Sequence, residues 1–154
     1  DKNKTYETVM LLGKTTDTQD ISGEILSEAA TSHLTENMVQ EAVLSFVGDY
    51  MQIPPMYSAL KVNGKKLYEL AREGVVIERK ARPVTILDIQ IKEINLPRGR
   101  MEVSCSKGTY IRSICHDIGE KLGCGACMGS LLRTKVGRFT LEDSTLRCCR
   151  FCVF

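Results

Sequence analysis

The stretch from Cys105 to Arg112 combines residue types that can bind an anion. Lysine, glycine, tyrosine and arginine stand at positions 107, 108, 110 and 112. Alternating apolar residues before it predict a strand over 100–105, and apolar spacings of 3, 4 and 7 predict a helix from 111 that ends at Gly123. A helix start presents free N–H groups and a positive dipole end, to which Lys107 and Arg112 would add full charges. The run therefore predicts a seat for a phosphate or a carboxylate.

Charge is unevenly distributed along the chain. Residues 1–60 carry 3 basic and 9 acidic side chains, whereas residues 61–154 carry 18 basic and 10 acidic ones. A basic C-terminal part favours a polyanion such as RNA, but ordinary solvated surface charge explains the composition equally well. The densest basic cluster contains Lys61, Lys65, Lys66, Arg72, Arg79, Lys80 and Arg82.

Seven cysteines raise the question of metal binding. Two Cys-x-x-Cys pairs, Cys124 with Cys127 and Cys149 with Cys152, are spaced nearly as in a four-cysteine zinc site. The alternative is that Cys124 is a small buried thiol, because it follows the expected helix end at Gly123 in a glycine-rich turn. We expect a cytosolic protein without a disulfide framework, since no membrane-length apolar run and no signal peptide are present.

The periodicity of the remaining chain predicts an α+β fold around a mostly antiparallel sheet. Thr35 is positioned to cap a helix whose apolar face includes Val39, Ala42, Val43 and Phe46. Turn formers make residues 15–23 a polar loop, in which Asp17 and Asp20 favour hydrogen bonds to nearby main chain over catalysis or metal binding. Strands are expected over residues 5–12, 75–77, 84–95 and 133–141, with a loop over 50–61 and a helix over 65–72.

Four segments in order resemble the family of tRNA pseudouridine synthase B, bacterial enzymes that isomerise the T-loop uridine of tRNA. They are the Lys-x-Tyr motif at 4–6, the Leu-Gly-x-x-Thr-Asp-Thr-x-Asp-x-x-Gly motif at 12–23, the Gln-Ile-Pro-Pro-Met-Tyr-Ser-Ala-Leu-Lys run at 52–61, and residues 105–112 with their helix. Residues 64–74 and 82–84 fit the same family. The likeness covers about residues 2–143.

The resemblance implies roles for particular residues. Tyr6 is similar to the family's active-site tyrosine, which stacks on the target base and takes part in proton transfer at its C5. Tyr110 and Leu131 resemble positions that line the pocket of the flipped uridine, and Arg112 resembles the arginine that pairs with the catalytic aspartate. Lys107 is expected to contact substrate. The resemblance also implies a pseudouridine synthase fold, a tRNA T-arm as partner, a monomer in the cytoplasm and no cofactor.

Two departures from the family pattern bear on activity. The nucleophilic aspartate belongs to a Gly-x-Leu-Asp-Pro-x-Ala-x-Gly-x-Leu segment that precedes the Lys-x-Tyr motif in the family, and these 154 residues do not contain it. The chain's Leu87-Asp88 step lies in an expected strand. We therefore expect residues 1–143 to be an incomplete catalytic domain, inactive alone, with an unpaired sheet edge or exposed apolar face.

The second departure is the cysteine-rich tail, residues 144–154, which is atypical of the family. Three hypotheses follow from the sequence. The chain is part of an RNA-modifying isomerase, or it is a non-catalytic RNA-binding remnant, or it is a zinc-stabilised binding module.

Overall fold

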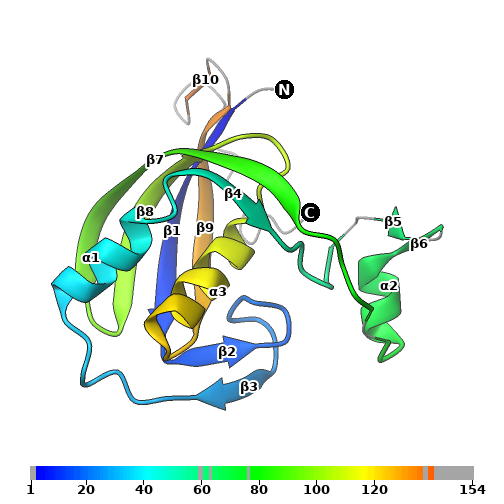
Figure 1. Ribbon diagram of the computed structural model, residues 1–154, viewed down its shortest axis with the longest axis horizontal. Coiled ribbons are helices and arrows are strands. Elements are labelled where there is room, and N and C mark those ends of the chain that lie inside the picture. The colour runs from blue at the N-terminus through cyan, green and yellow to red at the C-terminus, as the bar shows by residue number, and fades with distance from the viewer. Residues whose placement is uncertain (1–2, 59–60, 63, 76, 137–138, 141–154) are drawn as a thin grey trace.

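A six-stranded antiparallel sheet forms the centre of the molecule (Figure 1). The computed structural model describes residues 3–58, 61–62, 64–75, 77–136 and 139–140, and the side chains among these up to residue 132. The strand order is β10-β9-β1-β8-β7-β4. The bounds are β1 Lys4–Leu12, β4 Gly48–Gln52, β7 Arg82–Asn95, β8 Arg98–Cys105, β9 Ala126–Val136 and β10 Phe139–Thr140. The expected α+β fold with a mostly antiparallel sheet is therefore confirmed.

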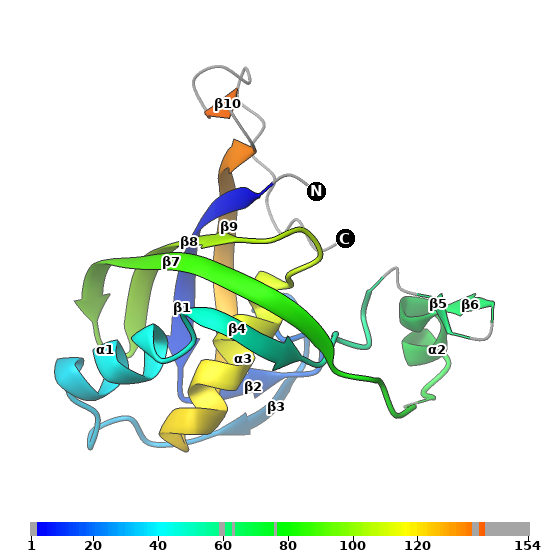
Figure 2. The ribbon, with the colours of Figure 1, turned by 45° about the horizontal axis from the view of Figure 1, so that its top comes forward.

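Two helices, α1 (Glu36–Leu44) and α3 (Ile111–Leu122), pack on one face of this sheet (Figures 1 and 2). Residues alternate along β1 and β8, so one side of each strand is buried beneath the helices. The fully buried core includes Met10, Met101, Val103, Ile114, Ile118 and Met128. None of the helices in the described part of the chain is long and apolar enough to cross a membrane.

Two small hairpins project from the sheet. The first pairs β2 (Lys14–Thr16) with β3 (Ile25–Glu28), and its connecting turn is the polar loop expected from the sequence. The second pairs β5 (Lys61–Val62) with β6 (Lys65–Lys66) and leads directly into α2 (Leu67–Arg72). Figure 2 shows β5, β6 and α2 standing apart from the sheet, beyond the ends of β4 and β7.

Both long helices begin or end where the sequence indicates. The Thr35 hydroxyl accepts a hydrogen bond from the Met38 N–H at 3.2 Å, which caps the start of α1. Gly123 ends α3 in the left-handed conformation, with φ of 85°, and its N–H donates to the carbonyls of Gly119 and Glu120. Phe46 lies two residues beyond α1 and packs edge-on against Tyr50.

Several expected boundaries are wrong. Residues 50–52 belong to strand β4 rather than to a loop, because their main chain pairs with residues 82–84 of β7. Val75 and Ile77 lie outside any strand. Residues 65–66 pair as β6 before helix α2 begins. The last long strand begins at Ala126, which follows directly on the tight turn at Gly123–Gly125.

A β-bulge in β7 overturns the simple alternation expected there. The pairing register with β8 shifts between Ile86 and Asp88, so Leu87 is exposed while Ile86 and Ile89 are both buried. At the β4 edge of the sheet, Met51 and the following Ile53 are also exposed.

The depth at which α3 sits on the sheet depends on Gly119. A Cβ atom at this position would overlap the main-chain nitrogen of Ala126 and the carbonyl carbon of Gly125. A Cβ at Gly123 would meet no atom within 4 Å, so its only cost is the left-handed conformation.

We predict that Gly119→Ala lowers the free energy of unfolding by about 3 kcal/mol, because α3 must move away from β9. Gly123→Ala should lower it by about 1 kcal/mol, the cost of placing a Cβ in a left-handed residue. Urea unfolding followed by circular dichroism measures both changes. Equal losses for the two variants would contradict a close helix–strand contact at Gly119.

Candidate active site

Tyr6 and Leu131 lie close together on the buried face of the sheet. Tyr6 is on β1, which pairs with β9, and the register places Tyr6 opposite Arg133 and Thr8 opposite Leu131. Because side chains two residues apart in a strand share a face, Tyr6, Thr8 and Leu131 point to the same side. Tyr6 and Leu131 both belong to the apolar cluster beneath α3, which also includes Ile111. The two therefore place an aromatic and an aliphatic side chain on the sheet face that α3 covers.

Tyr110 is the residue that immediately precedes α3. Its main chain is extended, and its side chain makes no capping hydrogen bond to the helix. Its main chain is held instead by the side chain of Gln52 from the end of β4. Lys107 lies in the exposed turn before Tyr110, so the described structure does not bring it to Arg112 as a joint anion seat.

Arg112, which the sequence suggested as part of an anion seat at the helix start, is buried, with 3 % of its surface exposed. Its guanidinium donates to the main-chain carbonyl of Thr18 at 3.1 Å and to that of Tyr57 at 2.7 Å. Burial lowers the pKa of Arg112, and the nearby carboxylate of Asp20 opposes that shift. The side chain is thus a fixed cation that joins two loops to the helix.

Asp20 is a buried carboxylate whose contacts are those of a turn. Its Oδ1 accepts hydrogen bonds from the Thr18 hydroxyl at 2.8 Å and from the N–H and hydroxyl of Ser22. Asp17 accepts from the Glu24 N–H at 2.8 Å. The local turn role expected for both aspartates is confirmed. In addition, the negative charge of Asp20 raises the pKa of Arg112, against the effect of burial.

The loop that carries Asp20 is attached to both β9 and α3. Ile21 N–H donates to the Met128 carbonyl, and Met128 N–H donates to the Gln19 carbonyl, at 2.8 and 3.0 Å. Gln19 has a φ of 69°, the single positive value among the described non-glycine residues. Its side chain accepts a hydrogen bond from the buried Ser113 hydroxyl at 2.8 Å. These contacts hold a strained turn beside Arg112.

The described cysteines are buried free thiols. Burial raises the pKa of Cys105 to about 11 and that of Cys115 to about 12, and it also raises the pKa of Cys127. Cys124 is buried as well, which agrees with the alternative that it is a small buried thiol. Within the described ranges, no three His, Cys, Asp or Glu side chains are grouped as metal ligands. Cys149 and Cys152 lie outside those ranges, and the zinc site stays a hypothesis.

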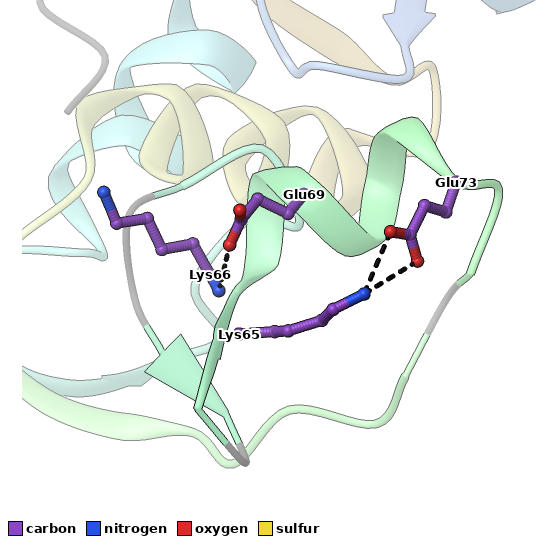
Figure 3. A network of polar contacts seen from close by, with 4 residues as sticks. All are labelled: Lys65, Lys66, Glu69 and Glu73. Carbon is purple, nitrogen blue, oxygen red and sulfur yellow. Dashed lines mark hydrogen bonds and ion pairs between the residues drawn. The ribbon is translucent and has the colours of Figure 1, made fainter.

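The basic cluster is partly neutralised within the β5–β6–α2 projection (Figure 3). Lys65 forms an ion pair with Glu73 at 2.9 Å, and the Glu69 carboxylate accepts from the Lys66 main-chain N–H at 2.9 Å. Lys66 and Arg72 lie over the Tyr68 ring. Beside the projection is a hollow of about 400 Å³ lined by Val62 and residues 78–83, which include Arg79, Lys80 and Arg82.

Two family models match consecutive parts of the chain. The TruB family pseudouridylate synthase N-terminal domain matches residues 1–111, and the tRNA pseudouridylate synthase B C-terminal domain matches residues 112–148. The chain belongs to the TruB family of pseudouridylate synthases. The division between the two matches falls between Ile111 and Arg112, at the start of α3.

Relatives in the TruB family include two bacterial proteins named tRNA pseudouridine synthase B. That of Clostridium novyi is 55% identical over 141 residues, which are 92% of this chain and 48% of that protein. That of Alkaliphilus oremlandii is 54% identical over 144 residues, 94% of this chain and 48% of that protein. The chain spans about half the length of the curated relatives it matches.

Solved structures show the same fold at lower identity. A chain of a Cbf5–Nop10–Gar1 complex matches with a TM-score of 0.64 and 30% identity, over 94% of this chain and 33% of that one. A structure of an H/ACA RNP bound to a substrate RNA containing 2'-deoxyuridine matches with a TM-score of 0.60 and 25% identity, over 94% and 31%.

Sequence reasoning missed the residues that hold the site together. Gln19, Gln52 and Ser113 are polar residues whose partners lie 58 to 94 positions away in the chain. Gln52 and Gln19 both fall inside segments that carry the family resemblance. Beyond that, nothing in their local pattern indicated a buried hydrogen-bonding role.

We predict that Cys105 and Cys115 resist alkylation in the folded protein at pH 8, because burial excludes the reagent and keeps both thiols protonated. After treatment with iodoacetamide, peptide mass spectrometry should find both cysteines unmodified in buffer. Both should be fully modified in about 8 M urea, which unfolds most small domains. Rapid modification in buffer would contradict the burial of either thiol.

Proposed function

We propose that this chain supplies part of the active site of a tRNA pseudouridine synthase that acts on the T-loop uridine. The observation that carries the proposal is the buried Arg112 guanidinium, fixed at the start of α3, the helix that packs on the sheet face carrying Tyr6 and Leu131. Family membership supports it. A flipped uridine needs an aromatic face and an apolar pocket, and a carboxylate nucleophile needs a fixed cation.

In the proposed reaction, an aspartate outside these 154 residues attacks the flipped nucleotide while Arg112 holds its carboxylate in place. The aspartate bonds to the ribose C1′ as the bond from C1′ to N1 of the base breaks. After the base rotates, C5 displaces the aspartate from C1′, the C5 proton is lost, and N1 takes up a proton. Tyr6 stacks on the base and takes part in removing the C5 proton, and Tyr110 and Leu131 line the pocket. The reaction is an isomerisation that requires no cofactor. We infer that the enzyme acts in the cytoplasm and as a monomer.

The test joins this chain to the segment that precedes the matched region in the Clostridium novyi relative. Pseudouridine formed in a tRNA transcript should be absent with the chain alone and present with the joined protein. Tyr6→Phe and Arg112→Lys should each lower turnover by about 10²–10³-fold, because a proton-transfer group or the two-pronged guanidinium is lost. Tyr68→Phe, on α2, is the matched control and should leave turnover unchanged.

Turnover by the chain alone would contradict the need for an aspartate from outside it. A joined protein that folds and binds the transcript without forming pseudouridine would instead favour the non-catalytic RNA-binding alternative. Bound zinc at one ion per chain, measured by metal analysis, would favour the zinc-stabilised module.

The basic residues around the hollow are proposed to contact the phosphates of the T-arm. Lys80 and Arg82 are exposed, and no described ion pair involves either side chain. Within the described structure, no ion pair offsets their positive charges, whereas Glu73 offsets the charge of Lys65. Lysine and arginine side chains that neutralise phosphates release counterions, so binding weakens as salt increases.

We predict that replacing both Lys80 and Arg82 by alanine weakens binding of a T-arm hairpin and lowers the slope of log affinity against log salt by about 1.5. Lys92→Ala, an exposed lysine on the polar side of β7, is the control and should change neither quantity. Fluorescence anisotropy at several salt concentrations measures both. An unchanged slope in the double variant would place the RNA elsewhere.

A further inference from the structure

We propose that Gln52 is a positioning residue, whose side-chain amide fixes the main chain of Tyr110 and thereby the aromatic lining of the uridine pocket. Gln52 ends strand β4 and is buried, with 2 % of its surface exposed. Its Nε2 donates to the Tyr110 carbonyl at 3.0 Å, and the Tyr110 N–H donates to its Oε1 at 2.9 Å. The inference rests on the proposed function, in which Tyr110 contacts the base.

The amide of Gln52 has one orientation in this setting. A side-chain amide offers two N–H donors on nitrogen and an acceptor on oxygen. The second Nε2 hydrogen is donated to the Tyr50 hydroxyl at 2.7 Å. That hydroxyl in turn interacts with the Asp117 carboxylate. Burial, and after it the negative charge of Asp117, raises the pKa of Tyr50. Because the Tyr50 hydroxyl donates its hydrogen to the carboxylate, its oxygen accepts from Gln52. A flipped amide would lose this bond and would set its oxygen against the Tyr110 carbonyl and its N–H group against the Tyr110 N–H.

The contacts from Tyr110 through Gln52 and Tyr50 to Asp117 connect two parts of α3 through strand β4. Asp117 lies six positions after Ile111, the first residue of α3, while Tyr110 precedes that residue. Tyr50 and Gln52 lie between them on one side of β4. The start of the helix is therefore tied to its middle through two side chains of the neighbouring strand.

Tyr110 needs such an outside restraint. It precedes α3 with an extended main chain and without a side-chain cap. The turn before it contains Gly108, whose φ is 86°. The paired hydrogen bonds to Gln52 act on the Tyr110 main chain as a neighbouring strand would. A pocket residue held before the ligand arrives loses less conformational freedom on binding, so fixing Tyr110 favours binding of the uridine.

The alternative is that Gln52 only stabilises the fold, and a double-mutant cycle separates the two roles. Gln52→Met keeps the length of the side chain and removes all its hydrogen-bonding groups. The dissociation constant for a T-arm hairpin is measured for this variant in the wild-type background and in a Tyr110→Ala background. We expect about a tenfold weaker affinity in the first and less than a twofold change in the second, because the effect passes through Tyr110.

An equal loss in both backgrounds would overturn the proposal. Gln40→Met, at an exposed position of α1, is the matched control and should leave affinity unchanged. If Gln52→Met does not fold, Tyr50→Phe takes its place, since it removes the hydroxyl that orients the Gln52 amide. It should weaken binding about threefold, again only while Tyr110 is present. A loss that persists without Tyr110 would overturn the proposal here too.

Amide hydrogen exchange gives a measurement that needs no RNA. Gln52→Met, or Tyr50→Phe if the former does not fold, should raise the exchange rate of the Tyr110 amide at least about tenfold. Amides in the β1–β8 pairing should stay as protected as in the wild type. Unchanged exchange at Tyr110 would overturn the role of Gln52. A wild-type chain that fails to bind the hairpin would instead contradict the proposed function, and the exchange result would still decide the role of Gln52.

Discussion

The buried guanidinium of Arg112 constrains the arrangement of everything around it. A charged group removed from water must be surrounded by hydrogen-bond acceptors, and the helix that carries Arg112 cannot supply them from its own main chain. The acceptors come from Thr18 and Tyr57, which lie 94 and 55 residues away in the chain. Two otherwise independent loops must therefore close on the start of α3. The same requirement explains why the first loop is attached both to β9, through Met128, and to α3, through Ser113.

The sheet contributes the apolar half of the site through its register. Tyr6 and Leu131 face the helix because β1 and β9 pair with Thr8 opposite Leu131. A one-residue slip of either strand would turn its side chain to the other face. The position of α3 over these residues is set independently, by the close approach of Gly119 to the beginning of β9. Register thus decides which side chains of β1 and β9 face α3, and Gly119 decides how closely the helix approaches the sheet.

The sequence predicted the elements whose signal is local. The alternation in β1 and β8, the cap at Thr35 and the helix end at Gly123 all depend on residues close in the chain. Contacts between distant residues had no such signal. Periodicity predicted the helix that begins just before Arg112, but it could not show that two loops cover that position. The bulge at Leu87 and strand β4 were missed for a similar reason, since both depend on pairing with another strand. Only the family resemblance, and no local pattern, predicted that the proposed site residues act together. These residues are Tyr6, Tyr110, Leu131 and Arg112.

The burial of Arg112 also changes what kind of anion it suits. The sequence suggested a general anion seat in which Lys107 and Arg112 share a phosphate. In the fold, Lys107 is exposed, while the Arg112 guanidinium already contacts two carbonyls and lies near Asp20. Burial lowers the pKa of Arg112, and a neighbouring negative charge offsets this effect. A carboxylate held at a fixed place satisfies that need at short range, whereas a mobile phosphate of the RNA backbone is better met by the exposed charges of Lys80 and Arg82. We therefore propose that the two kinds of positive charge serve different steps: the exposed residues attract the polyanion, and the buried arginine orients a nucleophile.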